Sequence, residues 1–247
     1  MKTSLIRRHL PVVALVVVTV CLLGGCSSSD NRAAAPENWL YTVVSMIDAN
    51  PASVVQTQAA LETLAIATRQ EIGNQSFQLY RCIDGAAGPA NYDFLTYENW
   101  SAESFANTHT RTHHYRTFQN QANTLLAAPM VVARCAMLSS PTLVTVDPAH
   151  IPVVSRMWAR PGQQQNAETT LANFVAFARS EAGCAGYDLH RGIDEPNQFI
   201  LHEAWRDEAA VNFHLGTQQF ADFMGQSPTL FTDNGYIEVN FLNLISQ

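Results

Sequence analysis

The sequence is almost without lysine. Lys2 is the only lysine among 247 residues, and 14 basic residues stand against 21 acidic ones, which gives a formal net charge of −7. Because the chain beyond Lys2 has no side-chain amine for a Schiff base, lysine-aldolase and pyridoxal-phosphate chemistry are excluded there. An acidic chain also lacks the basic surface that phosphate backbones require, so the sequence predicts no nucleic-acid partner.

Nucleotide-binding and zinc-site motifs are missing too. The chain has no GxGxxG and no GxxxxGK[ST] run, so nothing indicates a dinucleotide or a nucleoside triphosphate, and it has no CxxC and no HExxH. Apolar residues nevertheless make up 47% of the chain and charged residues only 14%. Such a composition can bury a core and is not typical of a disordered chain.

The first 39 residues have the pattern of an export signal followed by a tether. Lys2, Arg7 and Arg8 precede an almost wholly apolar run at 10–23, which is shorter than the roughly 20 residues of a membrane-spanning helix. The run ends in Leu-Gly-Gly-Cys, which resembles the bacterial lipobox. That resemblance implies a lipoprotein signal peptide at 1–25 and a diacylated Cys26.

We therefore expect a polar tether at 26–39 and a location at the bacterial cell envelope, with the chain lipid-anchored to a membrane through Cys26 and facing the periplasm or the exterior. An ordinary signal peptide, an uncleaved anchor and a twin-arginine signal are the alternatives. Loss of 1–25 would leave 11 basic and 21 acidic residues, so the net charge would become 11 − 21 = −10.

The rest of the chain is a tandem repeat of one sequence pattern. With a shift of 110 residues, Arg69-x-Glu71-x-Gly73 aligns with Arg179-x-Glu181-x-Gly183. Five extra residues near 85–89 then change the shift to 105. The later matches include Phe94 with Phe199, Glu98 with Glu203, Trp100 with Trp205, Asn107 with Asn212, His109 with His214, and Phe118 with Phe223. This shared order predicts two tandem domains, 40–138 and 151–245.

Each copy predicts the element order β-α-β-β-α-β, which is the ferredoxin-like plan. The expected strands are 40–48, 75–83, 92–100 and 130–138 in the first copy, and 151–159, 186–193, 197–205 and 235–245 in the second. The expected helices are 52–72 and 102–126, then 163–182 and 207–226, with Gly73 and Gly183 at helix C-caps.

A four-stranded sheet with helices on one face leaves its other face bare, and a bare apolar face must be covered. Two copies in one chain can cover each other. The expected fold class is therefore α+β, with two ferredoxin-like repeats forming an intramolecular dimeric α+β barrel, so that a monomer is already a pseudo-dimer. Further association stays open.

The second copy carries a fuller set of motifs. It reads Arg160-Pro161-Gly162, then E-A-G-C-A-G-Y at 181–187, then F-I-L-H-E-A-W at 199–205, followed by a helix with His214 and an aromatic residue. This pattern resembles the antibiotic biosynthesis monooxygenase domain of the dimeric α+β barrel superfamily. The first copy departs from it, with Asn74 for the cysteine and Phe77 for the tyrosine.

The resemblance implies an oxygenase that needs neither metal nor flavin. A small phenol or quinol would be held in a dry pocket and ionised, and molecular oxygen would be the co-substrate. We expect a cofactor-independent monooxygenase acting on a small aromatic or quinol substrate, with the second pocket as the active one. The alternatives are a non-catalytic envelope lipoprotein that binds small apolar ligands and a structural envelope protein.

The candidate catalytic residues come mainly from the second copy. His214 and its counterpart His109 are candidate bases, since imidazole titrates near neutrality. Glu203 shares strand parity with Trp205, so it could orient a histidine or play a structural part. Tyr187 could donate to a substrate oxygen, and Asn212 could bind a substrate carbonyl.

A metal site and a haem site are the alternatives to a cofactor-independent pocket. His109 and His113 are four residues apart on one predicted helix face, with His114 beside them. The second copy has Gln218 and Gln219 instead, so the expectation is no metal, and likewise no haem or other bound cofactor. Three cysteines follow the lipobox, namely Cys82, Cys135 and Cys184, and they leave open one disulfide with one free thiol, or no pairing.

Overall fold

The computed structural model describes residues 40–84, 91–142 and 147–247. The predicted signal peptide, Cys26 and tether lie outside these residues. No helix in the described part of the chain has the length and apolar character needed to cross a membrane. Both repeats belong to one compact unit, Pro36–Gln247.

The two repeats have the same element order. The first contains β1 (Tyr41–Ile47), α1 (Val54–Thr68), β2 (Asn74–Ile83), β3 (Phe94–Trp100), α2 (Glu103–His109), α3 (His113–Leu125) and β4 (Val131–Met137). The second contains β5 (Ile151–Trp158), α4 (Gln164–Ala178), β6 (Cys184–Gly192), β7 (Gln198–Trp205), α5 (Glu208–Leu215), α6 (Gln218–Leu230), α7 (Thr232–Gly235) and β8 (Glu238–Ser246).

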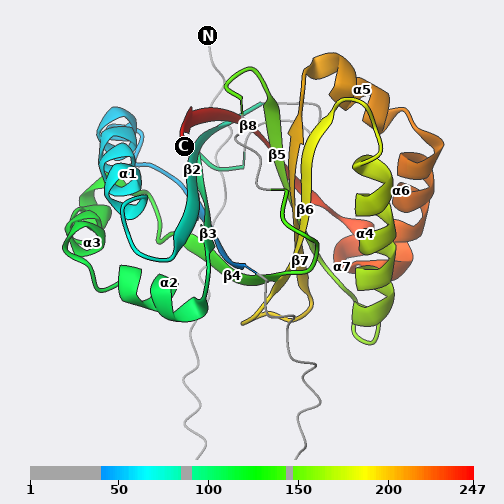
Figure 1. Cartoon of the computed structure of the whole chain (residues 1–247), viewed down its shortest axis with the longest axis horizontal. Coiled ribbons are helices and arrows are strands. Elements are labelled where there is room, and N and C mark those ends of the chain that lie inside the picture. The colour runs from blue at the N-terminus through cyan, green and yellow to red at the C-terminus, as the bar shows by residue number, and fades with distance from the viewer. Residues whose placement is uncertain (1–39, 85–90, 143–146) are drawn as a thin grey trace, which may run out of the picture. The chain divides into compact units, whose positions relative to one another are not determined.

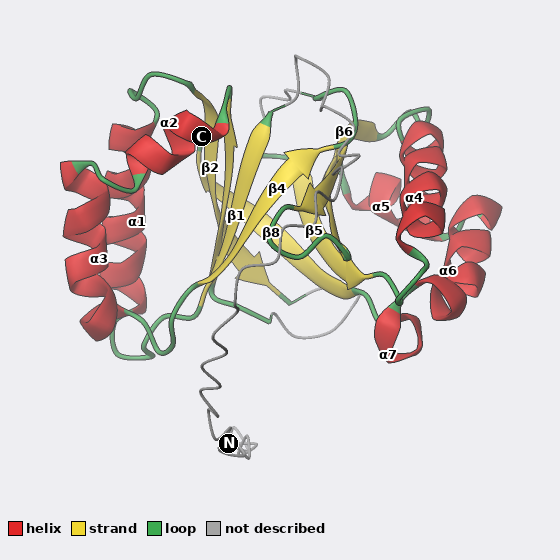
Figure 2. Cartoon of the chain, turned by 90° about the horizontal axis from the view of Figure 1, so that it is seen from below, coloured by secondary structure: helices red, strands yellow, loops and turns green. Residues whose placement is uncertain are grey.

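The eight strands close into one antiparallel barrel in the order β1-β3-β2-β8-β5-β7-β6-β4. Helices of the first repeat lie against one side of it and helices of the second against the opposite side (Figures 1 and 2). The α+β class, the two ferredoxin-like repeats and the intramolecular barrel are thus confirmed. The cause is the one expected, since each sheet covers the face that the other would leave bare.

The last strand of each repeat joins the two halves. β4 pairs with β1 of its own repeat and with β6 of the second, where Cys135 faces Gly192. β8 pairs with β5 of its own repeat and with β2 of the first, where Cys82 faces Leu242. Barrel closure removes the open sheet edges that would otherwise invite pairing with other chains.

Strand alternation divides the buried residues into layers. The barrel interior holds a central core that includes Val44, Tyr80, Tyr97 and Ile200. The two larger outer cores lie between each half-sheet and its own helices, and a small cluster of Tyr41, Trp100 and Ala106 lies under α2. The candidate residues His109 and His214 belong to the helical side of the sheet, so two separate pockets are possible.

Two details of the helix prediction were wrong. The helices predicted at 102–126 and 207–226 are each split, because Thr112 and Thr217 begin new helices and their side chains accept from the backbone N–H groups of Tyr115 and Phe220. The glycines are not C-caps, since α1 ends at Thr68 and α4 at Ala178.

The two glycines are needed for close packing. A Cβ on Gly73 would lie 2.2 Å from Phe105, and a Cβ on Gly183 would lie 2.3 Å from the Cβ of Ala210. The helix that carries each histidine can therefore approach the sheet closely. The three cysteines are free thiols, which agrees with the unpaired alternative.

Candidate active site

The second repeat encloses a cavity of about 340 Å³ between its half of the barrel and its helices. This lies within the range of roughly 300–1,000 Å³ typical of small-molecule pockets. The lining is mostly apolar and aromatic, and only a few polar side chains enter it. Its lining includes Phe174, Tyr187, Glu203, Trp205, His214 and Phe220.

His214 enters this cavity from the last turn of α5, and Glu181 holds it there. The Nδ1 atom of His214 lies 2.6 Å from Glu181 Oε2, and both side chains are almost fully buried. A carboxylate can only accept, so the imidazole donates its Nδ1–H to Glu181. In the neutral form of the ring the lone pair is then on Nε2. The pair has the arrangement of an oriented general base.

Aromatic rings surround the imidazole. The ring centroid of Trp205 lies 4.4 Å from that of His214, and the centroids of Phe174 and Phe220 each lie 5.4 Å away. Such walls exclude water and present flat apolar surfaces. A planar aromatic ligand fits this lining better than a charged or flexible one.

Glu203 lies in the same cavity but does not orient the histidine. Its Oε2 accepts from Trp205 Nε1 at 2.9 Å, and Tyr187 and Ser155 also bond to the carboxyl. Burial raises the pKa of Glu203 and of the Tyr187 hydroxyl. The structural role suggested for Glu203 therefore fits, since the carboxyl fixes the tryptophan and tyrosine that form the pocket wall.

The remaining predicted residues fall in different places. Asn212 is exposed and lies away from the cavity, so the prediction that it binds a substrate carbonyl was wrong. It precedes His214 by two residues, which is about 200° around a helix, and so it points to solvent. Tyr187 and Trp205 do line the cavity.

Glu181 was missed as a functional residue, although a signal for it exists. It lies in the turn after α4 and meets His214 only through the tertiary fold. The repeat preserves it, because Glu71 occupies the same place in the first copy. A carboxylate and a histidine that are retained in both copies could have been proposed as a pair.

The first repeat builds a smaller version of this site. Its cavity measures about 90 Å³ and is lined by His109 and Glu98 among others. Glu98 accepts from Trp100 Nε1 at 3.1 Å, and burial raises the pKa of Glu98 to about 8. Burial lowers the pKa of His109, whose Nδ1 lies 2.5 Å from Glu71. The first pocket keeps the polar groups but has little room for a ligand.

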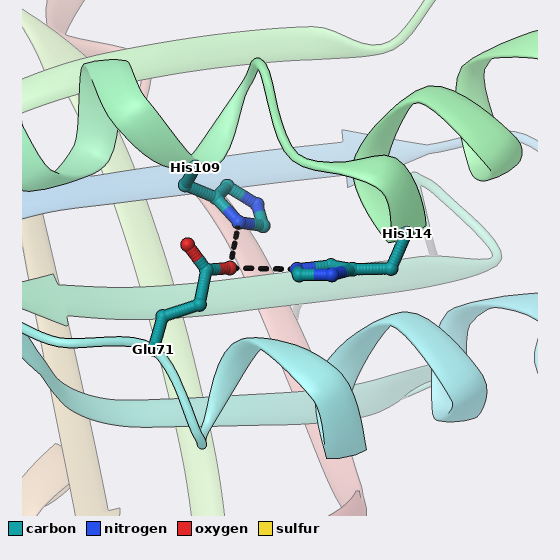
Figure 3. A group of neighbouring side chains, drawn as sticks. All are labelled: Glu71, His109 and His114. Carbon is teal, nitrogen blue, oxygen red and sulfur yellow. Dashed lines mark hydrogen bonds and ion pairs between the residues drawn. The ribbon is translucent and has the colours of Figure 1, made fainter.

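His109 also has a companion that His214 lacks. Nε2 of His114 lies 2.7 Å from the same Glu71 oxygen, so two imidazoles converge on one carboxylate (Figure 3). His113, which the sequence pattern paired with His109, does not belong to this cluster. The position of His114 is Gln219 in the second repeat.

A third cavity, of about 390 Å³, opens at one end of the barrel. It reaches the barrel-facing His202, whose Nε2 lies 3.0 Å from the Tyr80 hydroxyl. Burial lowers the pKa of His202 to about 4. A histidine with so low a pKa is a poor proton acceptor near neutrality, and the helical-side cavity, where a carboxylate orients the histidine, is the better candidate.

Comparison with known proteins agrees with this geometry. The family model described as antibiotic biosynthesis monooxygenase matches residues 40–121 and 151–226. The chain belongs to this family. The match to each repeat separately confirms the resemblance seen in the sequence motifs, and the residues that it covers include both histidines, both glutamates of the Glu–His pairs and both tryptophans.

Two relatives match 30% and 47% of this chain. YcnE of Bacillus subtilis, named provisionally as a monooxygenase, is 33% identical over 73 residues, which are 30% of this chain and 77% of that protein. The uncharacterised protein sll1783 of Synechocystis is 29% identical over 119 residues, which are 47% of this chain and 81% of that protein. The name of YcnE indicates monooxygenase-type chemistry for that protein and no particular substrate.

Solved structures share the whole two-repeat fold. A protein of Fusobacterium nucleatum, also named provisionally as a monooxygenase, superposes with a TM-score of 0.68 at 13% identity, over 85% of this chain and 94% of that one. An anthrone oxidase-like protein gives a TM-score of 0.64 at 11% identity, over 85% and 92% of the two chains. At such low identity the likeness shows the fold alone.

Proposed function

We propose that the second repeat is a cofactor-independent monooxygenase site for a small phenol or quinol. The observation that carries this proposal is the Glu181–His214 pair inside an aromatic cavity. The pair supplies a base, the cavity supplies a dry binding place for a flat ring, and the family and its relatives are associated with monooxygenase chemistry.

Such a site would transfer one oxygen atom of O₂ to the bound phenol. Nε2 of His214 takes the hydroxyl proton of the bound phenol, and Glu181 stabilises the imidazolium that forms. The phenolate passes one electron to O₂, and the resulting radical pair joins at a ring carbon that bears hydrogen. The imidazolium returns its proton to the peroxide anion, which gives a hydroperoxide and restores the neutral histidine. Loss of water from that carbon leaves a quinone, so one oxygen atom enters the product and the other leaves as water.

Each protein group has a defined task in this scheme. His214 moves the proton, and Glu181 sets its tautomer. Trp205 and Phe174 hold the ring and exclude water, and Tyr187 and Glu203 fix the wall. No bound metal or flavin takes part, since O₂ accepts electrons directly from the ionised substrate.

The test is oxygen uptake with hydroquinones, catechols and naphthols, using metal-stripped protein. We expect turnover by the wild type and a loss of about 10²–10⁴-fold in kcat for His214→Ala, which is the usual contribution of a general base. His150→Ala is the matched control, because His150 lies away from this cavity. No turnover in the wild type, or equal rates in the two variants, would contradict the assignment. Ligand-induced thermal stabilisation without turnover would support the non-catalytic binder instead.

We further propose that Cys26 anchors the chain to a membrane of the cell envelope. The support is the lipobox-like Leu-Gly-Gly-Cys after a charged and apolar leader. Labelling of expressing bacteria with a fatty-acid analogue should tag the wild type and not Cys26→Ser. Equal labelling of both proteins would refute the anchor.

A further inference from the structure

The first repeat holds three metal-ligand atoms in one place. Nδ1 of His109, Nε2 of His114 and a carboxylate oxygen of Glu71 all lie within 4.8 Å of one another. They come from the end of α2, the start of α3 and the turn after α1 (Figure 3). We propose that these three side chains form a site for a divalent transition-metal ion of the zinc class.

The donor set suits such an ion. Two imidazoles and one carboxylate are the ligands of several three-ligand zinc sites, which keep a fourth position for water or a ligand. Imidazole nitrogens favour zinc, nickel and copper over magnesium and calcium, which prefer oxygen-only shells. The site is therefore assigned to a borderline metal and not to a hard cation.

The geometry requires only small movements. Glu71 Oε1 lies 2.5 Å from His109 Nδ1 and 2.7 Å from His114 Nε2. Around a tetrahedral ion with ligand distances of about 2.0–2.1 Å, adjacent ligand atoms would lie roughly 3.4 Å apart. Each of these two separations must open by less than 1 Å, and the two histidine nitrogens, which lie up to 4.8 Å apart, must close to the same distance. Both neutral imidazoles must turn a lone pair to the ion, with the ring proton moved to the other nitrogen.

The surroundings allow this rearrangement. Nε2 of His109 is buried and has no hydrogen-bond partner among the described residues, and the His109 side chain lines the cavity of about 90 Å³. That space can hold a water that accepts a hydrogen bond from the relocated Nε2–H. His114 is partly exposed and borders a surface groove between α1 and α3, which provides an entry path for the ion.

The second repeat shows why this site is not a general property of the fold. Its Glu181–His214 pair matches Glu71–His109, but Gln219 replaces His114. Two donors instead of three remain there. The proposed metal site is thus separate from the proposed oxygenase cavity and exists in one copy only.

The experiment is zinc binding by the full-length chain carrying a tag without histidine, measured by calorimetry and elemental analysis, with cobalt absorption as a second reading. His114→Gln copies the second repeat, and His113→Gln is the matched control because His113 lies outside the cluster. We expect one zinc ion in the wild type and in His113→Gln. Loss of a residue that only supports a metal ligand lowers metal affinity by roughly 10–100-fold. His114 would itself be a ligand, so we expect the zinc affinity of His114→Gln to fall by more than this.

Circular dichroism of the metal-free proteins shows whether both variants fold alike. Zinc should raise the melting temperature of the wild type and leave that of His114→Gln unchanged. This result would support a bound ion that joins three segments. Absence of zinc binding in the wild type, or equal binding in His113→Gln and His114→Gln, would overturn the site. Oxygen uptake at the second repeat is measured on metal-stripped protein, so either proposal can fail without the other.

Discussion

The two repeats share a fold, a Glu–His pair and a Glu–Trp pair, yet they differ in what surrounds those pairs. In the second repeat the histidine faces a cavity of about 340 Å³, whereas the first has about 90 Å³. In the first repeat the glutamate binds a second histidine, His114. The two proposals therefore assign the same polar groups to a substrate in one copy and to an ion in the other.

This difference teaches that the retained residues alone do not define an activity. Glu98 and Glu203 both bond to a tryptophan, and both have raised pKa values because they are buried. They belong to the scaffold of either pocket. Room beside the imidazole and the identity of one residue on the following helix distinguish the copies.

The largest expected effect concerns the orienting carboxylate. Glu181→Gln should lower kcat by on the order of 10²-fold or more, since an amide cannot hold the imidazole tautomer or stabilise its cation as a carboxylate does. His109→Ala should cost far less turnover, because its cavity is small. Steady-state oxygen uptake gives both values. Comparable losses in the two variants would mean that the first pocket also reacts, which would contradict the proposed functional difference between the repeats.

The next effect is a pH dependence of stability. The pKa of Glu98 is raised to about 8 when folded, against about 4.3 in an unfolded chain. The folded state therefore binds the proton more tightly, and its stability falls as pH rises from about 4.3 to 8. In the wild type this loss in the free energy of unfolding should be on the order of a few kcal/mol, and Glu98→Gln should abolish it.

Urea unfolding at pH 5 and pH 8 measures this drop in the wild type and in Glu98→Gln. Gln can still accept from Trp100, so the variant keeps the buried hydrogen bond. An equal pH slope in both proteins would show that Glu98 ionises normally in the folded state.

A smaller difference is expected at the glycines. Gly73→Ala and Gly183→Ala both place a methyl group against the neighbouring helix, and Gly73 in addition has a φ of 87°. Overpacking costs typically about 1–3 kcal/mol, and the left-handed backbone adds about 1 kcal/mol for a non-glycine residue. In chemical denaturation, Gly73→Ala should be less stable than Gly183→Ala. The reverse order would show that α2 shifts away from the added methyl group more easily than α5 does.

The smallest effect should come from Tyr187→Phe, which copies Phe77 of the first repeat. The change removes the bond between the hydroxyl and Glu203 and leaves the ring in place. We expect a loss of about 1 kcal/mol in the free energy of unfolding, the usual net value of one hydrogen bond, with turnover largely kept. A collapse of turnover would make Tyr187 a catalytic residue and sharpen the difference between the copies.

The barrel could be predicted because the sequence positions that define it recur in both repeats. Matched positions such as Trp100 and Trp205 revealed the repeat, and the need to cover the bare sheet face then led to the closed architecture. The same alignment retains Glu181 and His214 in both copies and so offers them as a candidate pair. Their contact could not be predicted, since 33 residues separate them and only the packing of α5 against the sheet brings them together.

The errors have local physical causes. Asn212 was chosen by its nearness to His214 in sequence, while helix geometry turns it to solvent. His113 was paired with His109 on the assumption of a continuous helix, but the break before His113 ends that spacing. His114, on the new helix, reaches Glu71 instead.

The strands β4 and β8, which cross to the opposite half, have a consequence for how the molecule can change. In a symmetric dimer of single domains every substitution is made twice, so a change useful in one pocket is imposed on the other. Here the partner that completes each half-sheet is encoded in the same chain. A gene for this protein can therefore alter one pocket while the other is left as it was.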